Sequence, residues 1–348
     1  MSDAPLVRQA ASPRGPYMVG RAYDWAFFLL PPVLALVVGI AVSDSWLATN
    51  VWRVATEQDT ALGFFIGTVI HAHLVAVFFR SHGNPEIRRR HPIRFFVVPV
   101  ALYAAIVSWP WIAAWSIVVA TFWDVWHSGA QTFGFARIYE RNHGTPPELG
   151  RRLDFWLHQL MYAGPVLAGV TLMDHMASFD SFAKVGDAFL ASVPARAEGH
   201  ARWLTYGVLA IGSAFLVVYV TYYWRLARRG YRPAPLKIWL VVSTAFVSIY
   251  TWGFNTWGQA FLIMNLFHGV QYLAIVWAME GKRIAALMRL PRRPRIALAL
   301  YLGSVLLYGF GVQALDASVT VLWAITIVVS LMHFWYDAFI WSVRRAQV

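Results

Sequence analysis

The chain contains no cysteine and few charged residues, and both shortages exclude whole classes of protein. Without cysteine, thiolate metal sites, disulfides and cysteine nucleophiles are excluded. Only 13% of the 348 residues are charged, against about 25% in an average soluble domain, and 59% are hydrophobic. The sequence also lacks a GxSxG elbow, a P-loop and an HExxH motif, so the corresponding hydrolase, nucleotide and zinc-protease sites have no support. The composition indicates a membrane protein.

The apolar residues form helix-length runs without the alternation of a β-barrel, so we predict an all-α transmembrane bundle. Ten spans are expected, at 25–43, 61–79, 95–109, 111–136, 153–173, 203–224, 238–254, 258–279, 296–314 and 318–341. A flexible cytoplasmic tail at 1–22 and a short cytoplasmic tail at 344–348 flank this domain, which covers 23–343. The outer loop at 174–202 is expected to form an amphipathic helix on the membrane surface.

The basic residues predict how the bundle is oriented. The net charge is +12, and all but four of the 29 Lys and Arg residues lie on the side that carries both tails. The exceptions are Arg53, Lys184, Arg196 and Arg202. By the positive-inside rule both termini are cytoplasmic, so the basic charge reflects topology and not nucleic-acid binding. The expected location is a bacterial inner membrane.

Six of the eleven histidines are expected inside spans, in the cytoplasmic half or at the midplane of the bilayer. They are His71, His73, His127, His158, His268 and His333. The other five, including His175, are expected to be solvated. Ionisable groups are rare in hydrocarbon and normally face a site or a pathway. The six intramembrane histidines are therefore candidates for function.

Four of these histidines have a carboxylate, amide or phenol one helical turn away, on the same face of the helix. The four sets are Asp124, His127 and Gln131; Asp154, His158 and Tyr162; Asn265, His268 and Gln271 or Tyr272; and Ser330, His333 and Asp337. An imidazole with a neighbouring oxygen suits a metal site, because the oxygen can be another ligand or can fix the tautomer.

We therefore predict a metal centre formed by histidines from several helices. The predicted ligands are His71, His127, His268 and His333, with Asp337 as the favoured carboxylate and His73 as a weaker candidate. His71 ranks above His73 because the two point about 200° apart on a regular helix, and His71 shares the face of Gly63 and Gly67. The predicted catalytic residues are Asp124, Asp337 and Tyr272, and the predicted cofactor-binding residues are Gln131, Gln271 and His158.

The histidine patterns resemble those of known membrane enzymes. HxH at 71–73, HxxxQ at 127–131, HxxQ at 268–271 and HxxxD at 333–337 are similar to the clustered histidines of integral-membrane di-iron desaturases and hydroxylases. The isolated histidines in WHSGAQ and FHGVQY resemble those of the Brp/Blh-type carotene-cleaving oxygenases. The resemblance covers only these four short segments, and the chain has neither HxxxH nor HxxHH. We transfer no reaction from either family.

Three classes of function remain open from the sequence. The first is a non-haem metal oxygenase, hydroxylase or desaturase, because several neutral imidazoles with a carboxylate hold iron, mononuclear or dinuclear, and leave positions for dioxygen. Its substrate is expected to be a lipid or isoprenoid, with electrons from a soluble or membrane donor. The second is an electron carrier linked to haem or quinone, with paired histidines as haem ligands. The third is a transporter of a divalent metal or protons.

Overall fold

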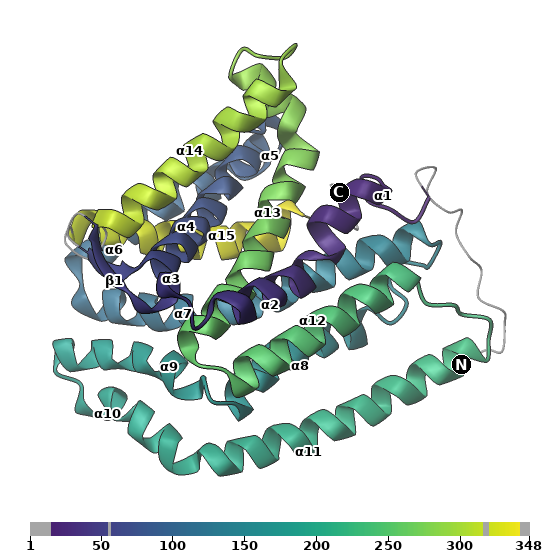
Figure 1. The fold of residues 1–348 in the computed structure, drawn as a ribbon, viewed down its shortest axis with the longest axis horizontal. Coiled ribbons are helices and arrows are strands. Elements are labelled where there is room, and N and C mark those ends of the chain that lie inside the picture. The colour runs from purple at the N-terminus through teal and green to yellow at the C-terminus, as the bar shows by residue number, and fades with distance from the viewer. Residues whose placement is uncertain (1–14, 55–56, 316–319, 342–348) are drawn as a thin grey trace.

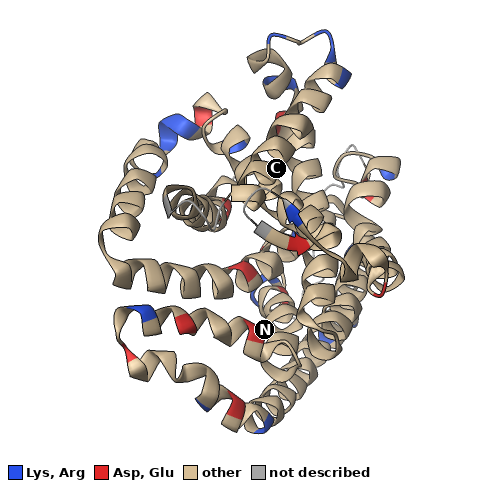
Figure 2. Ribbon diagram, turned by 60° about the vertical axis from the view of Figure 1, so that its left-hand side comes forward, with Lys and Arg blue, Asp and Glu red and all other residues tan. Residues whose placement is uncertain are grey.

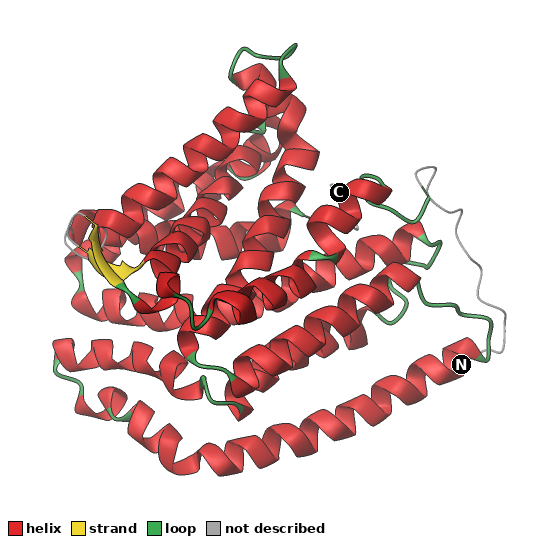
Figure 3. Ribbon diagram, viewed as in Figure 1, coloured by secondary structure: helices red, strands yellow, loops and turns green. Residues whose placement is uncertain are grey.

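A computed structural model describes residues 15–54, 57–315 and 320–341, and this part of the chain is almost entirely helical (Figure 1, Figure 3). The tail predicted at 344–348 and most of the tail predicted at 1–22 lie outside the described residues. The two short strands, β1 (Val51–Val54) and β2 (Glu57–Thr60), form an antiparallel pair in which Val51 lies opposite Thr60.

The helices fall into long segments and short connecting turns. The first half of the chain forms α1 (Arg21–Asp24), α2 (Pro31–Val42), α3 (Trp46–Thr49), α4 (Ala61–Ser81), α5 (Pro85–Arg90), α6 (Val98–Ser108), α7 (Pro110–Asn142) and α8 (Arg151–Ala168). The second half forms α9 (Leu172–Met176), α10 (Ala188–Ala191), α11 (Val193–Ala227), α12 (Pro235–Phe254), α13 (Trp257–Leu287), α14 (Pro294–Leu315) and α15 (Thr320–Ile340). Two π-helices, η1 (Trp25–Leu29) and η2 (Ile93–Val97), and the 3-10 helix η3 (Ala177–Val185) complete the described elements.

Six helices among the described residues are long and apolar enough to cross a membrane, namely α4, α11, α12, α13, α14 and α15. The number rises to as many as eight if the bent pairs α1–η1 with α2 and η2–α6 with α7 each form one span. An all-α membrane bundle is thus supported, whereas the predicted count of ten spans is not confirmed. The span predicted at 153–173 corresponds to α8, which begins with three charged residues, Arg151, Arg152 and Asp154.

Pro110 separates two of the predicted spans. Trp109 is extended, as expected for a residue that precedes proline, and α7 begins at Pro110. The chain bends by 120° there, so α6 and α7 form a helical hairpin. This places the 33-residue helix α7 across the bundle with His127 near its middle.

The centre of the bundle is built from α4, α7, α13 and α15. Helix α4 packs against α13 and α15, and α15 also packs against α7. Of the candidate spans, α13 is the most buried and α11 the least, and α11 lies along one edge of the molecule (Figure 1). Exposed side chains of α11 such as Ile211 and Val217 are apolar, as expected where lipid replaces water.

The predicted outer loop at 174–202 folds into η3, α10 and the start of α11, in place of one amphipathic helix. Phe182 of η3 is fully buried and its ring contacts Trp111 and Trp115 at the start of α7. The loop is therefore held against the protein. His175 of α9, expected to be solvated, is also buried, with Nδ1 2.8 Å from the Thr171 carbonyl oxygen.

Most charged residues lie near helix ends and turns, and few lie along the helices (Figure 2). The turn between α13 and α14 projects from the body and carries Arg289, Arg292 and Arg293 (Figure 1, Figure 2). Three basic residues that the sequence assigned to cytoplasmic loops, Arg80, Arg137 and Lys237, are instead buried and form ion pairs. Topology therefore explains only part of the basic charge.

Candidate metal centre

Four imidazoles from four helices meet in the centre of the bundle. His73 of α4, His127 of α7, His268 of α13 and His333 of α15 are all buried, with no more than 4% of any residue exposed. The ring centroids are 4.8 Å apart for His127 and His333, 5.0 Å for His73 and His268, 5.1 Å for His73 and His333, and 5.2 Å for His127 and His268. We call these four residues together with Asp337 the histidine cluster.

Asp337 lies one turn beyond His333 on α15, and its two carboxylate oxygens have different surroundings. Oδ1 accepts hydrogen bonds from the Tyr272 hydroxyl and from Trp341 Nε1, each 2.8 Å long. Oδ2 lies 3.7 Å from His127 Nε2 and 3.8 Å from His333 Nε2. One oxygen is thus held by donors, and the other faces the imidazoles.

A backbone contact assigns the tautomer of His333. Its Nδ1 lies 3.0 Å from the Leu74 carbonyl oxygen, which can only accept, so Nδ1 carries the proton. The lone pair of Nε2 then faces the cluster, 3.1 Å from His127 Nε2. Two ligands that bind one ion at about 2.1 Å and at a right angle lie about 3.0 Å apart. The spacing of these two nitrogens therefore suits a shared metal ion.

Several nitrogens of the cluster are buried without a partner. Within the described residues, three nitrogens make no hydrogen bond: Nδ1 and Nε2 of His73, and Nε2 of His268. Buried polar atoms are nearly always paired, because an unpaired one loses its bonds to water without replacement. His73, His268 and His333 offer ligand atoms within 4.8 Å of one another, and so do His127, His333 and Asp337. The cluster has the geometry of a metal site and the unsatisfied atoms expected of one.

The structure reverses the predicted ranking of His71 and His73. His73 is fully buried in the cluster, whereas His71 is only partly buried and belongs to neither group of possible ligands. The small-residue face that favoured His71 serves helix packing instead, since Gly67 lies against Gln313 of α14. Close approach on the other face comes from Gly269 of α13, where an added Cβ would lie 3.6 Å from the Cβ of His73.

The predicted catalytic residues lie at different places around the cluster. Asp337 belongs to it, and Tyr272 adjoins it, with its ring 4.4 Å from that of His333. Asp124 lies one turn before His127 and lines a small cavity together with Ser128 and Asn265. Asp124 is therefore near the cluster without being one of its possible ligands.

The predicted cofactor-binding residues do not all converge. Gln131 donates to the His268 carbonyl oxygen at 3.3 Å and to Gln271 Oε1 at 3.4 Å, and Gln271 donates to the Phe28 carbonyl oxygen. These amides connect α7, α13 and η1 beside the cluster. His158 lies outside the cluster, next to Asp154 on α8.

The sequence interpretation missed two residues that support Asp337, namely Arg80 and Trp341. The Arg80 guanidinium lies 3.9 Å from the ring centroid of Trp341, donates twice to the Ile340 carbonyl oxygen and pairs with Glu280 at 2.7 Å. Arg80 thus holds the end of α15 and the tryptophan that bonds Asp337. The spacing of four residues between Asp337 and Trp341 was the available signal, since it places both on one helix face.

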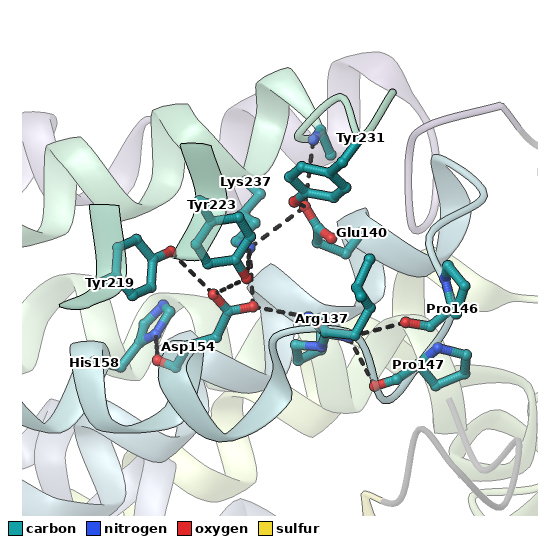
Figure 4. A network of polar contacts seen from close by, with 12 residues as sticks. Arg137, Glu140, Pro146, Pro147, Asp154, His158, Tyr219, Tyr223, Tyr231 and Lys237 are labelled. Atoms are coloured by element: carbon teal, nitrogen blue, oxygen red, sulfur yellow. Dashed lines mark hydrogen bonds and ion pairs between the residues drawn. The ribbon is translucent and has the colours of Figure 1, made fainter. Parts of the chain in front are cut away.

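A second buried polar cluster joins α7, α8, α11 and α12 (Figure 4). Its four charged members are Arg137, Glu140, Asp154 and Lys237, and we call them the charged cluster. Asp154 pairs with Arg137 at 2.8 Å and with Lys237 at 2.9 Å, and Lys237 lies 3.4 Å from Glu140. The formal charges sum to zero, so each charge is compensated inside the protein.

Tyrosines complete the bonding of the charged cluster. Tyr219 and Tyr223 of α11 donate to Asp154 Oδ1 at 3.0 and 2.6 Å, and Tyr231 donates to Glu140 Oε1 at 2.7 Å. Burial and the Glu140 carboxylate raise the pKa of Tyr231, which keeps its hydroxyl protonated and able to donate. Gly150 allows this packing, because its φ is +66° and a Cβ there would collide with the Tyr223 hydroxyl.

Comparison with known proteins adds no functional assignment. No protein-family model, curated protein or solved structure matches this chain. Any functional assignment therefore depends on the geometry of the two clusters.

Proposed function

We propose that the protein is an integral-membrane, metal-dependent oxidoreductase of the oxygenase, hydroxylase or desaturase type. Non-haem iron is the proposed metal, and an apolar lipid or isoprenoid is the proposed substrate. The observation that supports the proposal best is the convergence of four buried imidazoles and one carboxylate, with three nitrogens that have no partner within the described residues. Such atoms are stabilised by a bound cation and are costly without one.

The donor set favours a transition metal such as iron over calcium or magnesium. Neutral imidazoles combined with a carboxylate suit iron, whereas calcium and magnesium prefer oxygen ligands. Iron bound here would supply dioxygen activation, which no side chain of the protein can supply. The protein residues would hold the ion and would orient the carboxylate through Tyr272 and Trp341.

We further propose a single ion. His333 belongs to both groups of possible ligands but offers only Nε2, because Nδ1 is bonded to the Leu74 carbonyl oxygen. Two separate ions would have to compete for this one nitrogen. A mononuclear centre uses it once, with His73, His127, His268 and Asp337 available around it.

The alternative of a haem-linked electron carrier receives less support from the packing. A haem between two histidines would need a gap as wide as its macrocycle, and the four imidazoles contact one another directly. A divalent-metal transporter would use similar ligands. The oxidoreductase is preferred because the cluster is enclosed by buried side chains.

For the orientation we propose a bundle of ten spans, with α8 as a crossing helix, both termini in the cytoplasm, and residence in a bacterial inner membrane. The distribution of Lys and Arg supports this orientation. The site would then lie in the cytoplasmic half of the bilayer, within reach of a soluble or membrane electron donor and of substrate from the lipid.

Elemental analysis of purified protein, prepared without chelators, tests the proposal. We expect about one iron per chain and the loss of iron in His127→Ala and His333→Ala. His200→Ala is the matched control, because His200 is exposed on α11. A protein without stoichiometric transition metal, or variants that keep their metal, would contradict the proposal. A strong Soret band would favour haem instead.

A further inference from the structure

The face of α8 that carries Asp154, His158 and Tyr162 is not used by the histidine cluster. These residues are spaced four apart, so they follow one another along one side of the helix. All three are buried, with at most 1% of each exposed. A row of buried polar side chains within a membrane bundle requires an explanation beyond packing.

One end of this row is the charged cluster. Asp154 is bonded there to Arg137, Lys237, Tyr219 and Tyr223 (Figure 4). This cluster joins the last turns of α7 and α11 to the first turns of α8 and α12. In the proposed orientation these helix ends all face the cytoplasm, where protons are available.

The middle of the row has an unused proton acceptor. His158 Nδ1 lies 2.6 Å from the Asp154 carbonyl oxygen, so Nδ1 carries the proton and Nε2 has the lone pair. Nε2 is buried and has no partner among the described residues. A water molecule normally satisfies such an atom, and one turn further along α8 lies Tyr162.

The other end of the row opens on a cavity beside the histidine cluster. The Tyr162 hydroxyl lies 2.7 Å from Thr132 Oγ1, and Tyr162 lines the cavity together with Asp124, Ser128 and Asn265. The cavity offers about 10 Å³ to water, close to the space that one molecule needs. Asp124 and Asn265 each precede a cluster histidine by one turn, His127 and His268 respectively. The cavity therefore adjoins the proposed metal centre.

Asp124, which lines this cavity together with Tyr162, is suited to receive and release a proton. Within the described residues it has no hydrogen-bond or ion-pair partner, and it lies on α7 inside the proposed membrane bundle. An uncompensated carboxylate is costly in such surroundings, so the neutral acid is the stable resting form. A neutral acid beside a water site can give up a proton and recover one.

We propose that Asp154, His158, Tyr162 and Asp124 form a proton-conducting line from the charged cluster to the cavity beside the metal centre. A water molecule held by His158 Nε2 passes a proton toward Tyr162 as it receives one from the side of the charged cluster, while Nε2 remains a hydrogen-bond acceptor. Tyr162 gives its hydroxyl proton to the cavity water as it receives another, and the water reprotonates Asp124. Only protons move, and each group ends in its starting state.

This inference rests on the proposed function for its purpose, because reduction of dioxygen consumes protons. The route itself is built from residues outside the proposed ligands. It can be tested on the full-length protein without any turnover, by infrared spectroscopy of the protonated Asp124 carboxyl group. That band shifts when the proton is replaced by deuterium, and the rate of the shift after transfer to D₂O reports access to Asp124.

We expect the wild-type protein to show a carboxylic-acid band that disappears in Asp124→Asn and exchanges in a fast phase. Tyr162→Phe and His158→Leu should both lose this fast phase. Tyr206→Phe is the matched control, because Tyr206 is exposed on α11 and should exchange as the wild type does. Circular dichroism checks that the variants fold. If His158→Leu does not fold, the conservative variant Tyr162→Phe decides the test alone.

Fast exchange in either folded variant would overturn the line, because protons would then reach Asp124 by another route. A wild-type spectrum without any band sensitive to Asp124→Asn would overturn it as well. Metal content measured on the same samples separates the two proposals. Metal-free protein that keeps the expected exchange pattern would contradict the oxidoreductase and leave the proton line intact.

Discussion

The histidine cluster and the charged cluster are both buried in the same helical bundle, yet they differ in how far their polar atoms are satisfied. In the charged cluster every Arg, Lys, Asp and Glu has an ion partner, and three tyrosines donate to the carboxylates. In the histidine cluster three imidazole nitrogens have no partner within the described residues. Among the described residues, the four charged side chains leave a single buried atom without a hydrogen-bond partner, Glu140 Oε2. The charged cluster is therefore nearly satisfied as built, whereas the histidine cluster is satisfied only with something added.

This difference separates stability from function. Buried charges that compensate one another hold helices in place, and the removal of one leaves its partners uncompensated. Buried groups left unpaired cost free energy in the folded state, and proteins keep such groups where they serve a site. Substitutions in the two clusters should therefore have opposite effects on the stability of the metal-free protein.

The largest effect is expected in the charged cluster. Asp154→Asn leaves Arg137 and Lys237 without their shared carboxylate, and should lower the free energy of unfolding by about 3–5 kcal/mol. The measurement is thermal unfolding in detergent, with Asp180→Asn as the control because Asp180 is exposed on η3. Metal content per folded molecule should stay at the wild-type value. A loss of metal without a loss of stability would contradict the assignment of stability to the charged cluster and of metal binding to the histidine cluster.

The opposite sign is expected at His268. His268→Leu replaces a buried imidazole with an unpartnered Nε2 by an apolar side chain, and should stabilise the metal-free protein by about 1–3 kcal/mol. The same variant should lose bound metal. Unfolding of chelator-treated samples measures the first effect, with the exposed His200→Leu as control. Destabilisation of the metal-free protein by His268→Leu would show that the imidazole has a structural role.

The tryptophan beneath Asp337 should affect metal affinity and little else. Trp341→Phe keeps a ring for Arg80 to stack on but removes the donor to Asp337 Oδ1, so metal affinity should fall about tenfold. Titration with Co²⁺, followed by its visible absorption bands, measures the affinity. Trp335→Phe on α15 is the control, since the Trp335 ring faces Arg94. Equal affinities for Trp341→Phe and the wild type would mean that Tyr272 alone orients the carboxylate.

The smallest effect concerns His175, a buried histidine outside both clusters and outside the candidate spans. Burial lowers the pKa of His175 below its ordinary value of 6.5. Below about pH 6.5 the unfolded chain therefore binds a proton that the folded protein does not, and stability falls as the pH decreases. The slope from this one group should stay under about 1.4 kcal/mol per pH unit. His175→Gln should show a shallower loss than the wild type in melting temperatures measured from pH 7 to 5, and identical curves would contradict the assignment.

Much of the fold and the location of the site were accessible from the sequence. The low charge and the helix-length apolar runs predicted the all-α membrane bundle, and the bundle is supported. The one-turn spacing of His333 and Asp337 predicted that they share a helix face, and the structure brings both beside His127. The proposed roles of these residues in binding metal remain predictions.

Other features depended on packing that spacing does not reveal. His71 and His73 lie on different faces of α4, and only the positions of α13 and α14 decide which face points to the centre. The sequence placed Arg80, Arg137 and Lys237 in loops because their ion-pair partners are distant in sequence; Arg80 and Glu280, for example, are 200 positions apart. No local pattern encodes such pairs.

The sequence by itself determined the helices, their apolar surfaces and the four histidines with polar neighbours, because these follow from composition and from the 3.6-residue period. Tertiary structure decided which nitrogens remain unpaired and which charges are compensated. It also joined the DFWLHQLMY face of α8 to the cavity at Asp124, through Tyr162. The physical reason is that satisfaction of a buried polar group depends on atoms contributed by other helices, and their positions are set only when the bundle packs.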